Sequence, residues 1–236
     1  MFKNIDYFFY IGTNNKLFYE SLGVEDKKMI FLPYSINPLN LKFKEKEHLS
    51  KKIVFSGKLI DKKKPTDLLF AFSEIRKNNL KLYFAGEGEL RKKMEELIEQ
   101  LSLKKNVKLL GLLDKDELNK LYKDCDLLIL PSGYGETWGL VINEALEFGL
   151  PIISSDMVGS SVDLCNKNGY IFEYSNTLDL KSKIEKFYNL SLNDIEKMRI
   201  QSYELKDKFS FNTILTNLNK LIKDEKQSLD KVLQKS

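Results

Sequence analysis

Short apolar runs alternate with amphipathic stretches along most of the chain. The apolar runs are IVFS (53–56), LYFAG (82–86), VKLLG (107–111), DLLILPS (126–132), PIISS (151–155) and YIF (170–172). Helix-like segments lie between them, at roughly 66–78, 89–102, 115–124, 137–148 and 178–190. Strands without polar alternation that are separated by helices are typical of a parallel sheet covered on both faces. The pattern therefore predicts a Rossmann-like, doubly wound α/β domain.

The two flanks of this domain have patterns of their own. A small β-α-β unit precedes it, with strands at 5–11 and 29–35 and a helix at 13–22. A unit of this size cannot bury a core alone. Helical segments at 193–207 and 211–223 follow the domain and lead into a polar tail. We therefore predict three parts: residues 1–40, a sheet domain at 41–192, and C-terminal helices with the tail at 193–236.

Composition narrows the class of protein. The net charge is only +4 although the chain has 38 basic residues, which argues against a nucleic-acid partner. The start of the chain lacks the pattern of a signal peptide, and no apolar run approaches the ~20 residues that cross a bilayer. Cys125 and Cys165 form no C-x-x-C pair and are expected to be reduced thiols. We therefore expect a cytoplasmic protein. Its C-terminal helix either docks on a protein surface or lies peripherally on an anionic membrane.

The loops that follow the predicted strands carry the candidate chemistry, because ligands of open parallel sheets bind outside the carboxyl ends of the strands. These loops read SGKLIDKKKP (56–65), GEGE (86–89), GLLD (111–114), SGYGETWG (132–139) and SDMVGSS (155–161). Every one of them contains glycine. Glycine lets backbone amides approach a ligand closely, and phosphate groups bind well at helix N-termini. The loops therefore favour a phosphate-containing ligand.

Two glutamates mark the fourth loop and the helix after it. Glu136 lies among glycines at the mouth of the predicted helix, and Glu144 follows eight residues later. Eight residues are slightly more than two helical turns, so both carboxylates can lie along one side, with Glu144 two turns deeper. Paired carboxylates accept hydrogen bonds from sugar hydroxyls, which suits a polyol ligand. Two solvated surface charges are the alternative interpretation.

Lysines mark the first loop. Lys58 follows Gly57 directly after a predicted strand, and three more lysines come within a few residues, at Lys62, Lys63 and Lys64. Lysines in this position can neutralise a diphosphate. The alternative is a solvated lysine run in a lysine-rich protein.

At these residues the chain resembles glycosyltransferase family 4. The segment GETWGLVINEALEFGLPIISSD is similar to the E-x7-E motif of that family, with Glu136 and Glu144 as its glutamates. FSGKLIDKKKPTDLLFAF resembles its donor-phosphate loop, LYFAGEGELRKKME its G-x-G segment, LYKDCDLLILPS its strand ending in P-S, and NGYIF its closing segment. The resemblance runs from about 53 to 190. It implies the donor-binding domain of a retaining glycosyltransferase with the two-domain GT-B fold.

The resemblance also implies a role for each site residue. Glu144 would bind the nucleotide ribose, and Glu136 would bind the hydroxyls of the donor sugar. The backbone amides of four consecutive residues would face the sugar and the diphosphate: Thr137, Trp138, Gly139 and Leu140. The remaining donor loops would be completed by Gly57, Gly86, Gly111, Leu112 and Leu113, with the two leucines near the base.

Cations complete the implied site. Lys58 and Lys63 would stabilise the departing diphosphate, and Lys64, next to Pro65, is the alternative by one residue. Lys58 stands where the family often has arginine, which keeps the charge but loses the bidentate geometry. With the leaving group stabilised by cations and dipoles, an oxocarbenium-like sugar could be attacked on its original face. That scheme gives retention and needs no metal.

Two D-x-D triplets, at 114–116 and 124–126, could bind a cation in a metal-dependent transferase. The first opens a predicted helix and the second precedes a predicted buried strand, so capping and turn roles explain both. Asp114 and Glu117 have the spacing of a capping box. We therefore expect no metal site, and no cofactor besides the nucleotide-sugar substrate.

Residues 1–38 resemble only the last β-α-β piece of the acceptor-binding domain of a GT-B enzyme. The implied partners are a nucleotide-sugar donor, a glycan or lipid-linked acceptor, and, as one alternative, a second chain that supplies the acceptor domain. By analogy the transfer would serve bacterial polysaccharide or glycolipid assembly, with weak or no turnover by this chain alone. A non-catalytic nucleotide-sugar-binding subunit or an inactive fragment is the alternative. An oxidoreductase is disfavoured because GEGELR lacks the third glycine of G-x-G-x-x-G.

Overall fold

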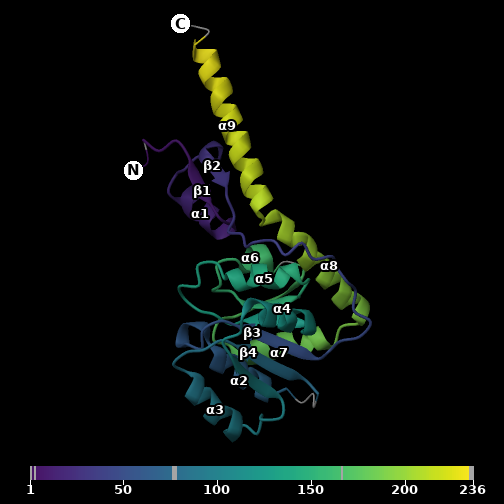
Figure 1. Ribbon diagram of the computed structural model, residues 1–236. Helices are drawn as coiled ribbons and strands as arrows, with labels where there is room; N and C mark the ends of the chain where they lie inside the picture. The colour runs from purple at the N-terminus through teal and green to yellow at the C-terminus, as the bar shows by residue number, and fades with distance from the viewer. Residues whose placement is uncertain (1, 3, 76–78, 166, 234–236) are drawn as a thin grey trace. The chain divides into compact units, whose positions relative to one another are not determined.

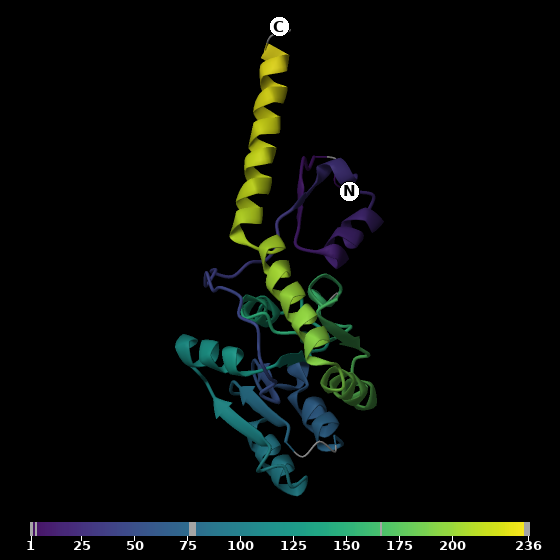
Figure 2. The same cartoon turned by 90° about the vertical axis from the view of Figure 1, so that its right-hand side faces the viewer.

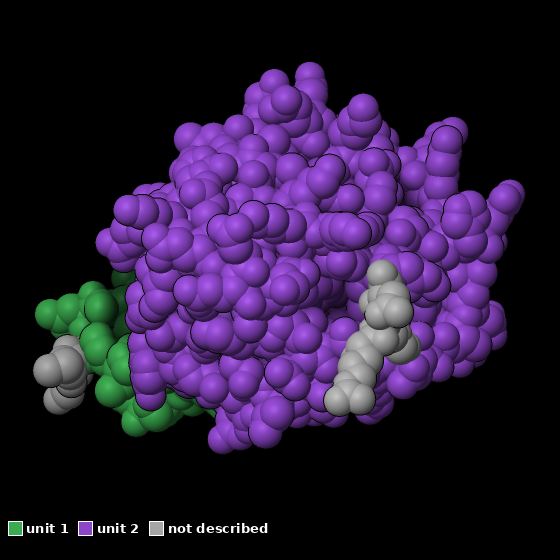
Figure 3. Space-filling view, turned by 90° about the horizontal axis from the view of Figure 1, so that it is seen from below, with its two compact units in different colours: residues 1–38, 207–236 green, residues 39–206 purple. Residues whose placement is uncertain are grey.

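The computed structural model describes residues 2, 4–75, 79–165 and 167–233. The chain forms two compact units, coloured separately in Figure 3. Unit 1 contains residues 1–38 and 207–236, and unit 2 contains residues 39–206. Within the described part of the chain, no helix is both long enough and apolar enough to cross a membrane.

Unit 2 is built on a six-stranded parallel sheet. Its strands are β3 (Lys52–Ser56), β4 (Lys81–Ala85), β5 (Val107–Gly111), β6 (Leu127–Leu130), β7 (Ile152–Ser155) and β8 (Gly169–Phe172). Their order is β5-β4-β3-β6-β7-β8, and every neighbouring pair is parallel. The predicted Rossmann-like sheet is confirmed. Because the order reverses between β3 and β6, the loops after these two strands diverge and leave a crevice at the carboxyl edge.

Helices cover both faces of this sheet (Figure 1). They are α2 (Pro65–Ser73), α3 (Arg91–Gln100), α4 (Lys115–Asp124), α5 (Leu140–Glu147), α6 (Ser161–Leu164), α7 (Thr177–Tyr188) and α8 (Leu192–Lys208). The core on one face joins α2, α3, α7 and part of α8 to the strands, and it contains Ile53 and Phe55 of β3. Val54, between them, points to the other face and is also fully buried. Burial on both faces explains the continuous apolar runs in the sequence.

The ends of three helices can be compared with the ends that the sequence predicts. The capping box predicted for α4 is confirmed, because the Asp114 carboxylate accepts from the Glu117 amide at 2.9 Å and the reciprocal bond measures 3.0 Å. α5 begins at Leu140 rather than at 137, because Gly139 has a left-handed φ of 88° and turns the chain just before the helix. α2 ends at Ser73, and the last three residues of the predicted segment 66–78 lie outside the described part.

Helix α8 extends unit 2 beyond residue 192, where the sequence analysis ended the sheet domain. Ile195 is fully buried and belongs to the same core as residues of α7 and the sheet. The Ser202 hydroxyl donates to the carbonyl of Leu150 at 2.7 Å, and it accepts from the side-chain amide of Asn168 at 3.1 Å. These contacts hold the helix on unit 2 as far as residue 206. The assignment of residues 1–40 to an acceptor domain stays a prediction.

Unit 1 combines the start and the end of the chain. Its elements are β1 (Phe8–Tyr10), α1 (Thr13–Ser21), β2 (Met29–Phe31) and α9 (Phe211–Leu233), and β1 pairs with β2 in parallel. The side-chain amide of Asn217 donates to the carbonyl of Phe31 at 2.7 Å, which ties α9 to β2. α9 is one continuous helix (Figure 2), and it runs to Leu233, beyond the helical segment predicted at 211–223. The segment lacks glycine and proline and is rich in helix-forming residues.

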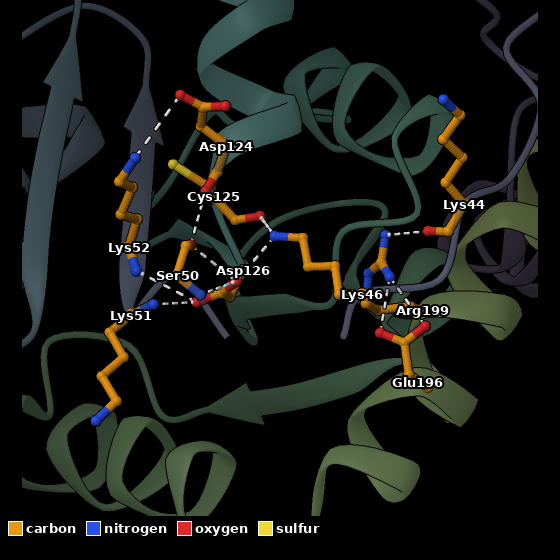
Figure 4. Close-up of polar contacts among 10 residues, drawn as sticks. All are labelled: Lys44, Lys46, Ser50, Lys51, Lys52, Asp124, Cys125, Asp126, Glu196 and Arg199. Carbon is orange, nitrogen blue, oxygen red and sulfur yellow. Dashed lines mark hydrogen bonds and ion pairs between the residues drawn. The ribbon is translucent and has the colours of Figure 1, made fainter. Parts of the chain in front are cut away.

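A buried carboxylate fixes the segment that leads into β3. Asp126, which precedes β6, is fully buried and forms an ion pair with Lys46 at 2.8 Å (Figure 4). It also accepts from the backbone amides of Ser50 at 3.1 Å and Lys51 at 2.6 Å. Since Asp126 belongs to the second D-x-D triplet, that triplet has a structural role at the amino end of the sheet. The network aligns β3 and β6, the two strands that carry the candidate site.

Candidate functional site

Two loops meet where the strand order reverses. One follows β3 and covers residues 57–64, and the other follows β6 and covers residues 131–139. The Gly133 amide donates to the carbonyl of Lys62 at 2.8 Å. The Lys63 ammonium forms an ion pair with the Glu136 carboxylate, and these side chains are only 19% and 11% exposed. The structure thus brings together the lysine loop and the glutamate loop.

The other lysines of the first loop form no ion pair with Glu136 in the described part of the chain, although the Lys62 side chain lies against the second loop, with its Nζ 3.4 Å from where a Cβ on Gly135 would be. Lys64 has a left-handed φ of 48° and turns its ammonium to Asp61, at 2.9 and 3.0 Å from the two carboxylate oxygens. This hydrogen bond raises the pKa of Lys64. Lys58 is exposed, and within the described residues it has no ion-pair partner. Lys63 alone among these lysines therefore pairs with Glu136, and Lys58 is available to an incoming anion.

Backbone amides at the start of α5 lack protein acceptors. In the part of the chain that the structure describes, the amides of Thr137, Gly139 and Leu140 donate to no protein acceptor. The Gly139 turn brings its own backbone against the strand, since a Cβ there would lie 2.8 Å from the Leu130 side chain. Orphan donors at a helix N-terminus carry a partial positive charge. This end of α5 is therefore suited to an anion.

The loop after β7 supports this turn from behind. The amide of Gly159 donates to the carbonyl of Glu136 at 2.9 Å. A Cβ on Gly159 would lie 1.9 Å from the carbonyl oxygen of Thr137, so only glycine allows this approach. Trp138 is buried, its indole donates to Asn143 at 2.8 Å, and its carbonyl accepts from the Ser160 hydroxyl. Trp138 thus anchors the loop through its side chain.

The second carboxylate, Glu144, lies on α5 and is half-buried. Its Oε2 accepts a hydrogen bond from the Tyr122 hydroxyl at 2.9 Å. Burial raises the pKa of Glu144 because its charged form loses water, and the Tyr122 hydrogen bond lowers that pKa in part. Glu144 is therefore a carboxylate held at the edge of the core by one specific donor.

The spacing of the two glutamates differs from the expectation of one on the helix mouth and one two turns deeper. Glu136 lies in the loop, four residues before α5 begins at Leu140, and Glu144 is only the fifth residue of the helix. The left-handed turn at Gly139 separates them. They do not form one stripe along a helix, because the chain changes direction between them.

Glycines let the loops after β3, β4 and β5 pack closely. The Gly86 amide donates to the carbonyl of Gly111 at 2.7 Å. A Cβ on Gly86 would lie 1.9 Å from the carbonyl oxygen of Gly57. Leu112 is 79% exposed just after β5, whereas Leu113 is half-buried. Leu112 is thus an exposed apolar side chain at the carboxyl edge of the sheet. It follows β5, whereas the Lys63–Glu136 pair joins the loops after β3 and β6.

Some residues at this edge escaped the sequence analysis. Arg91, at the start of α3, forms ion pairs with Glu87 and with Glu95, the latter at 3.0 Å. The Glu87 carboxylate lies 3.0 Å from where a Cβ on Gly111 would be, so the pair sits beside the β5 loop. Tyr122 lies in the helix predicted at 115–124, and the sequence analysis assigned it no role in the site. The local pattern carries no signal for these contacts, because each depends on tertiary packing.

No metal or thiol centre emerges from the described residues. In the described ranges, no group of three or more histidine, cysteine, aspartate or glutamate side chains could hold a metal ion. Both cysteines are buried, and burial raises the pKa of the Cys125 and Cys165 thiols to about 12. Such thiols stay protonated and are poor nucleophiles.

The family model described as "Glycosyl transferases group 1" matches residues 39–211. This range contains the whole sheet of unit 2 and every residue of the candidate site. The chain belongs to this family. The predicted fold class is confirmed, because the parallel Rossmann-like sheet is that of GT-B glycosyltransferase structures.

Two relatives illustrate the similarity. An uncharacterized glycosyltransferase of Methanocaldococcus jannaschii is 36% identical over 150 residues, which cover 57% of this chain and 38% of that protein. An alpha-1,4-N-acetyl-D-galactosaminyltransferase of Campylobacter jejuni, named for a PP-undecaprenol-linked glycan, is 30% identical over 192 residues. These residues cover 78% of this chain and 50% of that enzyme. The chain therefore spans half or less of the length of these curated relatives.

Solved structures share the fold at lower identity. HepE of Anabaena in complex with UDP has a TM-score of 0.78 at 16% identity, over 93% of this chain and 64% of that one. The pneumococcal O-GlcNAc transferase GtfA, in complex with UDP and GlcNAc, has a TM-score of 0.72 at 22% identity, over 93% and 45%. At these identities the likeness concerns the fold of the glycosyl transferases group 1 domain.

Proposed function

We propose that this chain is the donor-binding part of a family 4-type, retaining glycosyltransferase. It would bind a nucleoside diphosphate sugar at the carboxyl edge of the unit 2 sheet and support glycosyl transfer with retention. The transfer would serve bacterial polysaccharide or glycolipid assembly, as the named activities of several relatives suggest. Membership of the glycosyl transferases group 1 family supports a transferase over a purely regulatory subunit.

One arrangement carries the proposal: cations and orphan amides converge at the strand-order reversal. Lys63 is paired with Glu136, Lys58 is exposed, and within the described residues the amides of Gly139 and Leu140 at the start of α5 donate to no protein acceptor. A diphosphate carries two or more negative charges and many acceptor oxygens. Such a group is complementary to a helix N-terminus flanked by lysines.

Each site residue has a proposed role. Glu144 would accept from the ribose hydroxyls, and Glu136 from the hydroxyls of the donor sugar. The diphosphate would be bound by Lys58, Lys63 and the amides of residues 137–140, with Lys64 as the neighbouring cation. Gly57 and Gly86 would give it room. The base would lie against Gly111, Leu112 and Leu113, since Leu112 is exposed beside these loops.

Retention would follow from stabilising the leaving group. As the bond from the anomeric carbon to the diphosphate breaks, negative charge grows on the diphosphate oxygen. Lys58, Lys63 and the α5 amides would stabilise this charge. The acceptor oxygen would then bond to the same face of the sugar, and its proton would pass to the departing diphosphate oxygen. We propose that the reaction needs no metal and no cofactor, because these groups supply the positive charge.

The acceptor is proposed to be a glycan or a lipid-linked glycan. Because the chain spans half or less of its curated relatives, acceptor recognition would involve further polypeptide, either in a longer chain or in a partner chain. The work would be done in the cytoplasm, with at most peripheral contact at the inner face of the membrane.

The proposal is tested by calorimetric titration of the purified chain with UDP, GDP and ADP. UDP is the first probe because five of the structural neighbours are described with it or with a UDP-sugar. One nucleotide is expected to bind. The double variant Lys58→Ala/Lys63→Ala is expected to bind it at least about tenfold more weakly, because two charge-assisted contacts are lost.

The matched control is Lys104→Ala. Lys104 also forms an ion pair with a glutamate, Glu99, but lies outside the candidate site on an exposed surface. Its removal is expected to leave nucleotide affinity unchanged. A folded chain that binds none of the three nucleotides, or a double variant that binds as well as the wild type, would overturn the proposal.

A further inference from the structure

Tyr122 is buried, yet it belongs to none of the loops that form the candidate site. It lies near the end of α4, and its side chain is 1% exposed. Its ring packs on Phe148 with 5.5 Å between ring centroids. Phenylalanine would fill the same space, so packing alone does not account for the hydroxyl group.

The Tyr122 hydroxyl joins two elements of the site. It donates to Glu144 Oε2 at 2.9 Å. The Ser56 side chain lies near the same hydroxyl and acts to lower its pKa. Ser56 is the last residue of β3, directly before Gly57 and Lys58, whereas Glu144 lies on α5. The hydroxyl therefore binds the helix that carries the second carboxylate and lies beside the strand that carries the first lysine loop.

The pKa shifts of Tyr122 and Glu144 favour a hydrogen bond from the tyrosine hydroxyl to the carboxylate. Burial, and then the nearby charge of Glu144, raise the pKa of Tyr122 well above its ordinary value, so the hydroxyl keeps its proton. Burial raises the pKa of Glu144, and the Tyr122 hydrogen bond opposes that shift by favouring the ionised form. An ionised carboxylate offers about four acceptor positions on two oxygens. With Oε2 bound by Tyr122, Oε1 remains for a ligand.

We propose that Tyr122 is a positioning residue of the nucleotide site. It holds Glu144 by Oε2 and so aims Oε1 at the ribose hydroxyls of the bound nucleotide. The proposal rests on the proposed function, which assigns the ribose to Glu144. Tyr122 does not touch the ligand, and its effect passes through Glu144 alone. A binding carboxylate whose rotamer is fixed by a second group is better preorganised for its ligand.

A double-mutant cycle separates this role from simple packing. Tyr122→Phe, Glu144→Ala and the double variant are titrated with the nucleoside diphosphate that the wild-type chain binds, chosen from UDP, GDP and ADP. Tyr122→Phe is expected to weaken binding about tenfold, the equivalent of one charge-assisted hydrogen bond. In the Glu144→Ala background the same change is expected to have less than about a twofold effect, because the group it acts through is gone.

Tyr188→Phe is the matched control. Tyr188, at the end of α7, is another tyrosine with a buried hydroxyl, and burial and then the charge of Asp126, at the amino end of the sheet, raise its pKa. Loss of its hydroxyl is expected to leave nucleotide affinity unchanged. Thermal melting verifies that every variant folds. If Tyr122→Phe does not fold, Ser56→Ala instead removes the polar group beside the hydroxyl and is expected to weaken binding about threefold.

The outcomes distinguish the proposal from the function on which it rests. Equal losses from Tyr122→Phe in both backgrounds, or no loss in the wild-type background, would overturn the positioning role while the nucleotide site stands. Unchanged binding by Glu144→Ala would instead remove the ribose role of Glu144, and the positioning role with it. A folded wild-type chain that binds no nucleotide would overturn the proposed function itself.

Discussion

Lys63 and Glu136 form an ion pair that joins the loop after β3 to the loop after β6. Both side chains are mostly shielded from solvent, so the pair is less screened than a surface salt bridge. It holds the proposed sugar-binding carboxylate beside the proposed diphosphate-binding cation before any ligand arrives. The two loops are therefore preorganised as one site.

Glu136→Gln should separate sugar recognition from diphosphate recognition. The variant loses a charged acceptor for sugar hydroxyls but leaves the α5 amides and Lys58 intact. Its affinity for the nucleoside diphosphate is expected to stay within about threefold, whereas its affinity for the matching nucleotide-sugar falls about tenfold. Calorimetry with both ligands measures this, with Glu99→Gln as a surface control. Equal loss for both ligands would mean that Glu136 does not face the sugar.

Glu144 should lower the stability of the fold near neutral pH. Its folded-state pKa is raised by burial, so the folded state binds a proton more readily than the unfolded chain does. Stability therefore falls as pH rises through the unfolded and then the folded pKa. Glu144→Gln, which resembles the protonated form, is expected to melt at a higher temperature than the wild type near neutral pH.

The higher melting temperature expected for Glu144→Gln should disappear at about pH 4, where glutamates become protonated in the unfolded chain. Melting curves of both proteins over this pH range provide the test. A lower melting temperature for Glu144→Gln at neutral pH would show that the charge of Glu144 stabilises the fold instead.

Gly86→Ala should disrupt the packing of the loops at the carboxyl edge. Gly86 has a φ of 142°, and a Cβ there would meet the carbonyl oxygen of Gly57 at 1.9 Å. Backbone cannot move aside cheaply, so a loss of about 2–4 kcal/mol in unfolding free energy is expected. Gly23→Ala is the control, since Gly23 also has a positive φ, of 79°, but open space around it, and about 1 kcal/mol is expected. Urea unfolding measures both, and equal losses would contradict the packing argument.

Asp126→Asn should destabilise unit 2 far more than Asp124→Asn. Asp126 is a fully buried carboxylate that pairs with Lys46, as Figure 4 shows, and its loss is expected to reduce the unfolding free energy by about 3 kcal/mol or more. Asp124 is half exposed and reaches Lys52 only at 3.7 Å, so its change is expected to stay within about 0.5 kcal/mol. Similar losses in urea unfolding would contradict the structural role of the triplet.

The chain alone is expected to show weak or no transfer. The proposed donor groups all lie in unit 2, whereas acceptor recognition is proposed to need further polypeptide. A transfer assay with the bound nucleotide's sugar and a lipid-linked glycan measures this. Robust turnover by the purified monomer would contradict this expectation.

The fold was predictable because both faces of the sheet are buried. Each strand therefore consists of consecutive apolar residues, which the sequence shows directly. The Asp114–Glu117 box was predictable because capping is a local effect. The α5 boundary was not, because glycines at 133, 135 and 139 left it open which of them would turn the chain. The contact of Tyr122 with Glu144 spans 22 residues and two helices, so no local pattern encodes it. The end of α9 lies beyond the predicted segment 211–223, because its last turns are polar and carry no strong apolar periodicity.

The most direct test of the account is a crystal structure of the chain with its bound nucleoside diphosphate. The account predicts diphosphate oxygens within about 2.7–3.2 Å of the amides of Gly139 and Leu140. It also predicts the Lys58 ammonium beside the diphosphate and ribose hydroxyls donating to Glu144. A nucleotide bound away from the carboxyl ends of β3 and β6, with these amides still unpaired, would contradict it.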